Sequence, residues 1–87
     1  MATASEWIDL LDRVGCLNVD EIVAPPGYIL QLDLPYASYV IRDEQPDRRL
    51  PGTDEFFIDG LFLRCEFQGR LVYYSVDSIE KIQLNPA

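Results

Sequence analysis

The stretch RCEFQGRLVYYSVDSIEKIQLNPA, residues 64–87, decides the fold of this chain. Gln68-Gly69 suits a two-residue loop between antiparallel strands, because glycine readily adopts the positive φ that such loops need. Closing the loop between Phe67 and Arg70 sets a register in which apolar pairs share one face: Leu61 with Val76, Leu63 with Tyr74, and Cys65 with Val72. A one-residue slip would exchange the two faces, so this segregation itself predicts the hairpin.

The opposite face of this hairpin pairs Phe62 with Ser75, Arg64 with Tyr73, and Glu66 with Leu71. Aromatic and arginine side chains are enriched at protein interfaces. We therefore take four residues as a candidate protein-binding face: Phe62, Arg64, Leu71 and Tyr73. The competing interpretation is a second core layer, covered by a helix or by the closure of a barrel.

Residues 3–14 have the pattern of an amphipathic helix. Thr3 and Glu6 fit a capping box, in which each side chain accepts a hydrogen bond from the other residue's backbone N–H. Gly15 is placed to end the helix in a left-handed conformation. Four apolar residues follow the spacing of one helical stripe: Trp7, Leu10, Leu11 and Val14. A helix this short is marginal alone, so we expect the stripe, Trp7 included, to pack on the core rather than on a partner.

Alternating polarity predicts strands at about 28–34, 38–42, 56–67, 70–76 and 80–84, with a brief turn or 3₁₀ helix in SVDSI before the last one. Residues 42–55 are rich in proline and charged side chains, which indicates a long exposed loop, either functional or mobile. One helix followed by about five antiparallel strands, without βαβ alternation, indicates an α+β fold. We expect a single domain, 1–87, with a small curled sheet or barrel.

The order of a helix and then strands, closing on LVYYSVDSIEKIQL, resembles the Sm-like and SH3-like small β-barrel domains. In those folds a single 3₁₀ turn separates the last two strands. The resemblance covers residues 71–84 and the order of the elements, and it implies a small barrel. Sm-like rings that bind RNA carry basic or aromatic nucleotide pockets, whereas this chain is acidic and has no residues that match those pockets. The resemblance therefore implies the fold and not a function.

The composition is typical of one soluble domain. A chain of 87 residues can bury one thin core, and its hydrophobic fraction of 48% argues against wholesale disorder. No apolar run approaches the ~20 residues of a membrane span. The acids in MATASEWIDLLD do not fit a signal peptide. We therefore expect a cytoplasmic protein with reduced cysteines.

Acidic side chains outnumber basic ones by 15 to 7, for a formal net charge of −8 at pH 7. Such a chain repels nucleic acid and anionic lipid, so we expect neither direct nucleic-acid binding nor membrane binding. A partner protein with a basic or mixed surface is electrostatically favoured. Pairing of an edge strand with a second copy, to give a homodimer, is a further use of the sheet.

The chain lacks the usual equipment of a reaction centre. It contains no histidine, which removes the commonest general base and metal ligand. Cys65 falls on the apolar face of the hairpin, so core packing is its favoured role. Five carboxylates in or beside the loop form a candidate acidic surface: Asp43, Glu44, Asp47, Asp54 and Glu55. Their spacing lacks the glycine and the distal acid of a calcium loop, so we expect no metal and no cofactor.

These observations favour a non-enzymatic acidic protein-binding module, acting as an accessory, adaptor or inhibitory protein. The alternative is a nucleic-acid mimic that inhibits a nucleic-acid-binding enzyme, as phage-encoded anti-defence proteins do. In a mimic, helix acids such as Glu6, Asp9 and Asp12 would join the acids of residues 42–55 in a basic channel of the target. An enzyme is not expected, because the residues for general acid–base or nucleophilic catalysis are missing.

Overall fold

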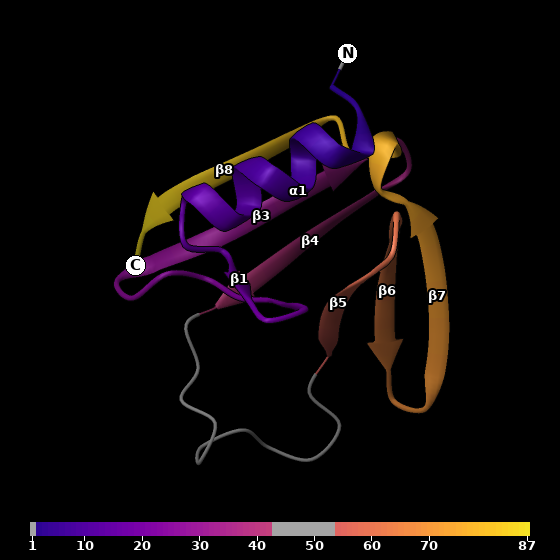
Figure 1. Cartoon of the computed structure of the whole chain (residues 1–87). Coiled ribbons are helices and arrows are strands. Elements are labelled where there is room, and N and C mark those ends of the chain that lie inside the picture. Colours follow the sequence, from indigo (N-terminus) through magenta and orange to yellow (C-terminus); the bar gives the residue numbers. More distant parts are fainter. Residues whose placement is uncertain (1, 43–53) are drawn as a thin grey trace.

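The computed structural model describes residues 2–42 and 54–87 (Figure 1). Helix α1 (Ala4–Arg13) comes first, and antiparallel strands follow it, so the predicted α+β class is confirmed. The strands are β1 (Leu17–Asn18), β2 (Glu21–Ile22), β3 (Tyr28–Leu34), β4 (Ala37–Arg42), β5 (Glu55–Asp59), β6 (Phe62–Phe67), β7 (Arg70–Ser75) and β8 (Lys81–Pro86). A 3₁₀ helix, η2 (Val76–Ser78), separates β7 from β8, as the sequence predicts. In the described residues, no helix is long and apolar enough to cross a membrane.

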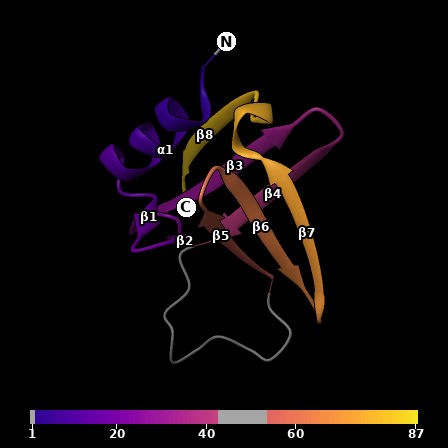
Figure 2. The same ribbon diagram turned by 45° about the vertical axis from the view of Figure 1, so that its right-hand side comes forward.

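The strands form two sheets, one with the order β1-β2-β5-β6-β7 and one with the order β4-β3-β8. Figures 1 and 2 show that the strands of the two sheets run in clearly different directions. In both views α1 lies on the β8 side of the molecule and the β6–β7 hairpin on the other. The described strands therefore form the curled-sheet version of the prediction, in two separate hydrogen-bonded sheets rather than one.

The core lies between the inner faces of the two sheets and one side of the helix. Leu30 and Leu32 of β3 and Leu63 of β6 have no exposed surface, and neither has Leu11 of α1. On β8, Ile82 and Leu84 pair with Leu32 and Leu30, so they share the inner face as their alternation predicts. The rest of the buried apolar set is Cys16, Ile22, Ala24, Leu34, Phe56, Cys65, Val76 and Ile79.

The predicted helix and its cap are confirmed. The Thr3 side chain accepts a hydrogen bond of 3.2 Å from the backbone N–H of Glu6, and Glu6 Oε1 accepts one of 3.0 Å from the N–H of Thr3. These bonds favour the carboxylate, so the pKa of Glu6 lies below its ordinary value. Gly15 follows the helix with a φ of +79°, as a left-handed end requires. Leu11 is buried and Trp7 packs against the core, as the apolar stripe predicts.

The predicted register of the β6–β7 hairpin is also confirmed. Phe67 pairs with Arg70 across the turn, Leu63 pairs with Tyr74, and Cys65 pairs with Val72. The turn residues Gln68 and Gly69 both have positive φ angles, of 47° and 86°. This is the backbone geometry that lets a two-residue loop follow the right-handed twist of its strands.

The predicted single strand over 56–67 is wrong, because the chain reverses at Gly60 between β5 and β6. Gly60 has a φ of +62° and takes the first position of the two-residue loop Gly60-Leu61, where a hairpin turn of this kind favours glycine. The predicted inward pair of Leu61 and Val76 is therefore wrong too. Leu61 lies in the turn and is 56% exposed, whereas Val76 is buried. One backbone hydrogen bond of 3.0 Å, from Val76 N–H to the Leu61 carbonyl, joins the two residues.

Smaller corrections concern the ends and number of the strands. The hairpin of β1 and β2 was not predicted, because strands of two residues are too short to show a period. β7 ends one residue earlier than predicted, and β8 extends further, to Pro86. Arg42, which falls in both the predicted strand over 38–42 and the predicted loop over 42–55, belongs to β4, and Glu55 belongs to β5 rather than to the loop. Residues 43–53 of that loop lie outside the described residues.

A cluster of aromatic side chains connects the two sheets. Tyr39 of β4 and Tyr74 of β7 place their hydroxyl oxygens 2.8 Å apart, within hydrogen-bonding distance. The Tyr39 ring also contacts Phe56 and Phe67, with centroid distances of 5.2 Å and 5.5 Å. Burial, followed by the hydrogen bond to Tyr74, raises the pKa of Tyr39 well above its ordinary value. This cluster turns the inner side of the β6–β7 hairpin toward β4 and leaves its other side facing outward.

Candidate protein-binding face

We call the side of the five-stranded sheet that is turned away from the core the outer face. The strand register places its side chains in three rows across the sheet. The rows are Glu55, Glu66 and Leu71; then Glu21, Phe57, Arg64 and Tyr73; then Asp59, Phe62 and Ser75. All four residues predicted as a protein-binding face therefore lie together on β6 and β7.

The large apolar side chains of the outer face are open to solvent. Phe62 is 53% exposed, Leu71 57% and Tyr73 51%. Side chains of a second core layer would be mostly covered, so this competing interpretation does not hold for the described part of the chain. The consequence is a group of half-exposed apolar side chains on adjacent strands.

Arg64 lies in the middle of the outer face and is held on several sides. Its guanidinium carbon is 4.6 Å from the centre of the Phe57 ring. Its Nη1 is 3.6 Å from Asp59 Oδ2, and its Nε is 3.4 Å from Glu66 Oε1. The Arg64 Nε is shielded from solvent, and no described group meets it in hydrogen-bonding geometry. Exposed ion pairs add little stability, so their main effect here is to hold the guanidinium over the Phe57 ring.

Leu61 lies in the turn next to Phe62, and the other exposed large apolar residues of the described chain lie on other elements. Val19 lies in the turn between β1 and β2, and Tyr36 lies in the turn between β3 and β4. Tyr28 begins β3, and Val40 lies on the outward side of β4. Single exposed apolar residues are normal on protein surfaces, whereas a cluster calls for an explanation.

The outward side of the three-stranded sheet is polar instead. Asp33 Oδ1 accepts hydrogen bonds from the Ser38 hydroxyl, at 2.6 Å, and from Gln31 Nε2, at 3.1 Å, while Lys81 Nζ lies 3.5 Å from Asp33 Oδ2. These partners, the Ser38 hydroxyl first, hold the pKa of Asp33 below its ordinary value. Since these polar groups bind one another, they are less available for contact with a partner protein than the side chains of the outer face are.

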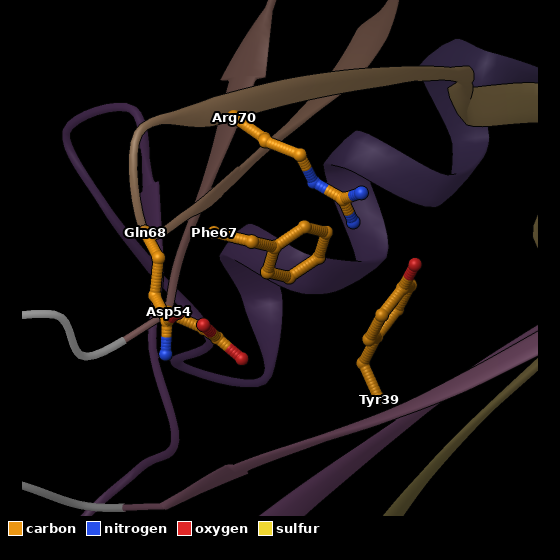
Figure 3. Close-up of a pocket in the computed structure, with 5 residues that line it drawn as sticks. All are labelled: Tyr39, Asp54, Phe67, Gln68 and Arg70. Carbon is orange, nitrogen blue, oxygen red and sulfur yellow. The ribbon is translucent and has the colours of Figure 1, made fainter.

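A pocket of about 590 Å³ opens beside the β6–β7 turn (Figure 3). Its described lining residues are Tyr39, Asp54, Phe67, Gln68 and Arg70. In Figure 3 the Arg70 guanidinium points toward the Tyr39 hydroxyl across the side of the Phe67 ring. Its volume falls in the range of small-molecule sites, about 300–1,000 Å³, but the lining supplies no nucleophile paired with a base. The sequence could not indicate this pocket, because its residues come from three separate segments: Tyr39, Asp54 and the turn over 67–70.

The predicted acidic surface is only partly described. Asp54 is exposed and lines the pocket, and Glu55 lies on the outer face opposite Glu66. The other three carboxylates, Asp43, Glu44 and Asp47, lie outside the described residues. Asp54 and Glu55 are neighbours in sequence, but Asp54 lines the pocket whereas Glu55 lies on the outer face.

Among the described residues, no group of three or more histidine, cysteine, aspartate or glutamate side chains is arranged to hold a metal ion. Cys16 and Cys65 are free thiols, and both are buried. Burial raises the pKa of each thiol, which makes both poor nucleophiles. Cys65 therefore lies in the core, as predicted.

Sequence reasoning missed part of the outer face. Glu21 joins it because β2 pairs with β5, where Glu21 lies opposite Phe57. A strand of two residues offers no periodic signal that could have placed it there.

No protein-family model matches the chain, and no curated protein or solved structure matches it either.

Proposed function

We propose that the protein is a non-enzymatic, acidic protein-binding module of the cytoplasm, acting as an accessory, adaptor or inhibitory protein, and that the outer face is its contact surface. One observation carries the proposal. Phe62, Leu71 and Tyr73 are each about half exposed on adjacent strands around Arg64. Aromatic and arginine side chains that lie together form the kind of anchor that dominates binding energy at protein interfaces.

The charges around the anchor suit a protein partner. Asp59 and Glu66 flank Arg64, so the apolar group is bordered by carboxylates. Burying Phe62 and Tyr73 against a partner would remove apolar area from water, and rim charges would steer the approach of a basic surface. Preorganisation helps as well, because Arg64 already lies over the Phe57 ring and little of its side-chain freedom remains to be lost.

Replacing Tyr73 by alanine should weaken partner binding by about 2 kcal/mol and change the free energy of unfolding little. Tyr73 is 51% exposed, so its loss removes an anchor without opening a cavity. The comparison uses partners captured from a lysate of the source organism, followed by titration of the purified partner. Val40→Ala is the matched control, because Val40 is 53% exposed on an edge strand of the other sheet.

The same titration separates the module from a nucleic-acid mimic. Reversing two loop charges, Asp43→Lys with Glu44→Lys, should mainly slow association with the partner and change its salt dependence. A mimic requires the opposite ranking, with the charge reversal abolishing binding and Tyr73→Ala having little effect. If Tyr73→Ala unfolds the protein, the side chain serves the fold, and the outer face loses its proposed role.

A further inference from the structure

Strand β7 is the end strand of the five-stranded sheet, and among the described residues the backbone groups along its outer edge have no backbone partner. The pair that closes a two-residue hairpin exchanges both of its hydrogen bonds, and such pairs alternate along the ladder. Since Phe67 and Arg70 close this hairpin, the backbone groups of Leu71 and Tyr73 point away from β6. No described residue supplies them with a backbone partner on that side.

The free edge of β7 also lacks the features that block strand pairing. Proteins protect sheet edges with charged residues, proline or very short strands. The other edges of the described sheets have such features: β1 is only two residues long, β8 carries Lys81 and Pro86, and β4 ends at Arg42. The one charged residue of β7, Arg70, turns its backbone groups toward β6. The open edge therefore runs through Leu71 and Tyr73.

The charges beside this edge select the chemistry of an incoming strand. Glu66 of β6 lies next to Leu71, whereas Asp59 lies on β5, two strands away from β7, opposite Phe62. The cation between them, Arg64, is within ion-pairing distance of both carboxylates. A second copy of the chain would bring a further formal charge of −8, whereas a basic segment would meet complementary charge.

We infer that the edge of β7 binds an extended segment of a partner protein, rich in lysine or arginine, as an added strand. Its backbone would pair with Leu71 and Tyr73, and its alternate side chains would continue the outer face, with apolar groups beside those two residues and cations near Glu66. This inference rests on the proposed function and adds to it the form and charge of the partner segment.

The test uses a fluorescent synthetic peptide of about eight residues that alternates valine with lysine. Two further versions carry N-methyl groups, one on the valines and one on the lysines, so each retains its side chains but cannot donate from one of its edges. At least one version should bind at least about tenfold more weakly, because two or three backbone hydrogen bonds are lost. Bound peptide should also slow amide hydrogen exchange at Leu71 and Tyr73.

Two variants of the protein complete the test. Leu71→Lys places a blocking cation on the edge and should weaken peptide binding at least about tenfold. Val40→Lys makes the same kind of change on β4 and should leave peptide binding unchanged. If both methylated peptides bind as well as the parent, or if the parent peptide does not bind, strand addition at β7 is wrong.

The outcomes also separate this inference from the proposed function. If Tyr73→Ala loses partner binding while all the peptides bind equally well, the outer face remains the proposed contact surface and strand addition at β7 is rejected. If Tyr73→Ala binds the partner as well as the parent protein does, the outer face is rejected as the contact surface. A dimer in sedimentation experiments that Leu71→Lys converts to a monomer would assign the edge to a second copy and overturn the inference.

Discussion

Replacing Leu63 by alanine should lower the free energy of unfolding by about 2–4 kcal/mol. Leu63 has no exposed surface, and it lies in β6 between Ile58 of β5 and Tyr74 of β7. Truncating it removes a buried isobutyl group and leaves a cavity that the rigid strands on either side cannot fill. Urea denaturation, monitored by the fluorescence of Trp7, measures the change. Trp7 is a suitable reporter because it packs against the same core.

Leu71→Ala is the matched control for this experiment. It changes the same residue type on the neighbouring strand, but Leu71 is on the outer face and is 57% exposed. Its replacement should change the free energy of unfolding by less than about 0.5 kcal/mol. Equal losses in the two variants would contradict the assignment of inner and outer faces to the hairpin.

Cys65 in the folded protein should react with iodoacetamide at least about a thousandfold more slowly than in the unfolded chain. Burial, with a smaller contribution from the charge of Asp54, raises the pKa of the Cys65 thiol from 9.0 to about 12. The thiolate is the reactive form, so this change in pKa lowers the reactive fraction about a thousandfold near neutral pH. Mass spectrometry of the modified protein, with and without denaturant, measures both rates.

Cys16 is the internal comparison, because it is also fully buried and burial raises its pKa as well. Both thiols should become reactive together when denaturant unfolds the chain. Fast modification of Cys65 without denaturant would show that β6 opens locally. A disulfide between the two cysteines in protein prepared from reducing cytoplasm would contradict the free thiols of the structure.

The raised pKa of Cys65 makes the stability of the folded protein depend on pH. The folded pKa of Cys65 lies above its ordinary value of 9.0, so its contribution is fully present below about pH 9. Above that pH the unfolded chain releases the thiol proton first, and stability falls as pH rises toward the folded value. Tyr39 acts in the same direction, because burial raises its pKa too. Cys65→Ala should make the alkaline loss of stability shallower.

The sequence by itself determined the features that depend on neighbouring residues. Gln68 and Gly69 set a hairpin register that the structure reproduces from the Phe67–Arg70 pair to the Phe62–Ser75 pair, because a two-residue turn leaves one way to align its strands. Thr3 and Glu6 likewise set the start of α1, because a capping box needs only residues three apart. The α+β class followed from such local patterns.

Local patterns failed where two kinds of signal competed or where segments were too short. The apolar residues around Gly60 favoured one long strand, but the turn at Gly60 and Leu61 reverses the chain, and the pairing of β5 with β6 stabilises that reversal. The hairpin of β1 and β2 joins the sheet through the pairing of Glu21 with Phe57 and through a backbone hydrogen bond of 2.7 Å from the Ile58 N–H to the Asp20 carbonyl. Contacts between residues so distant in sequence leave no periodic trace in either segment.

The tertiary structure alone decided whether the second side of the β6–β7 hairpin is covered as well as the first. Both sides carry apolar residues, so the sequence left a binding face and a second core layer as alternatives. The contact of Tyr39 with Tyr74 turns the side of Leu63 and Cys65 toward the other sheet, while α1 lies on the β8 side of the molecule. Phe62, Leu71 and Tyr73 stay half exposed because a helix of ten residues and one small sheet cover only one face of the hairpin.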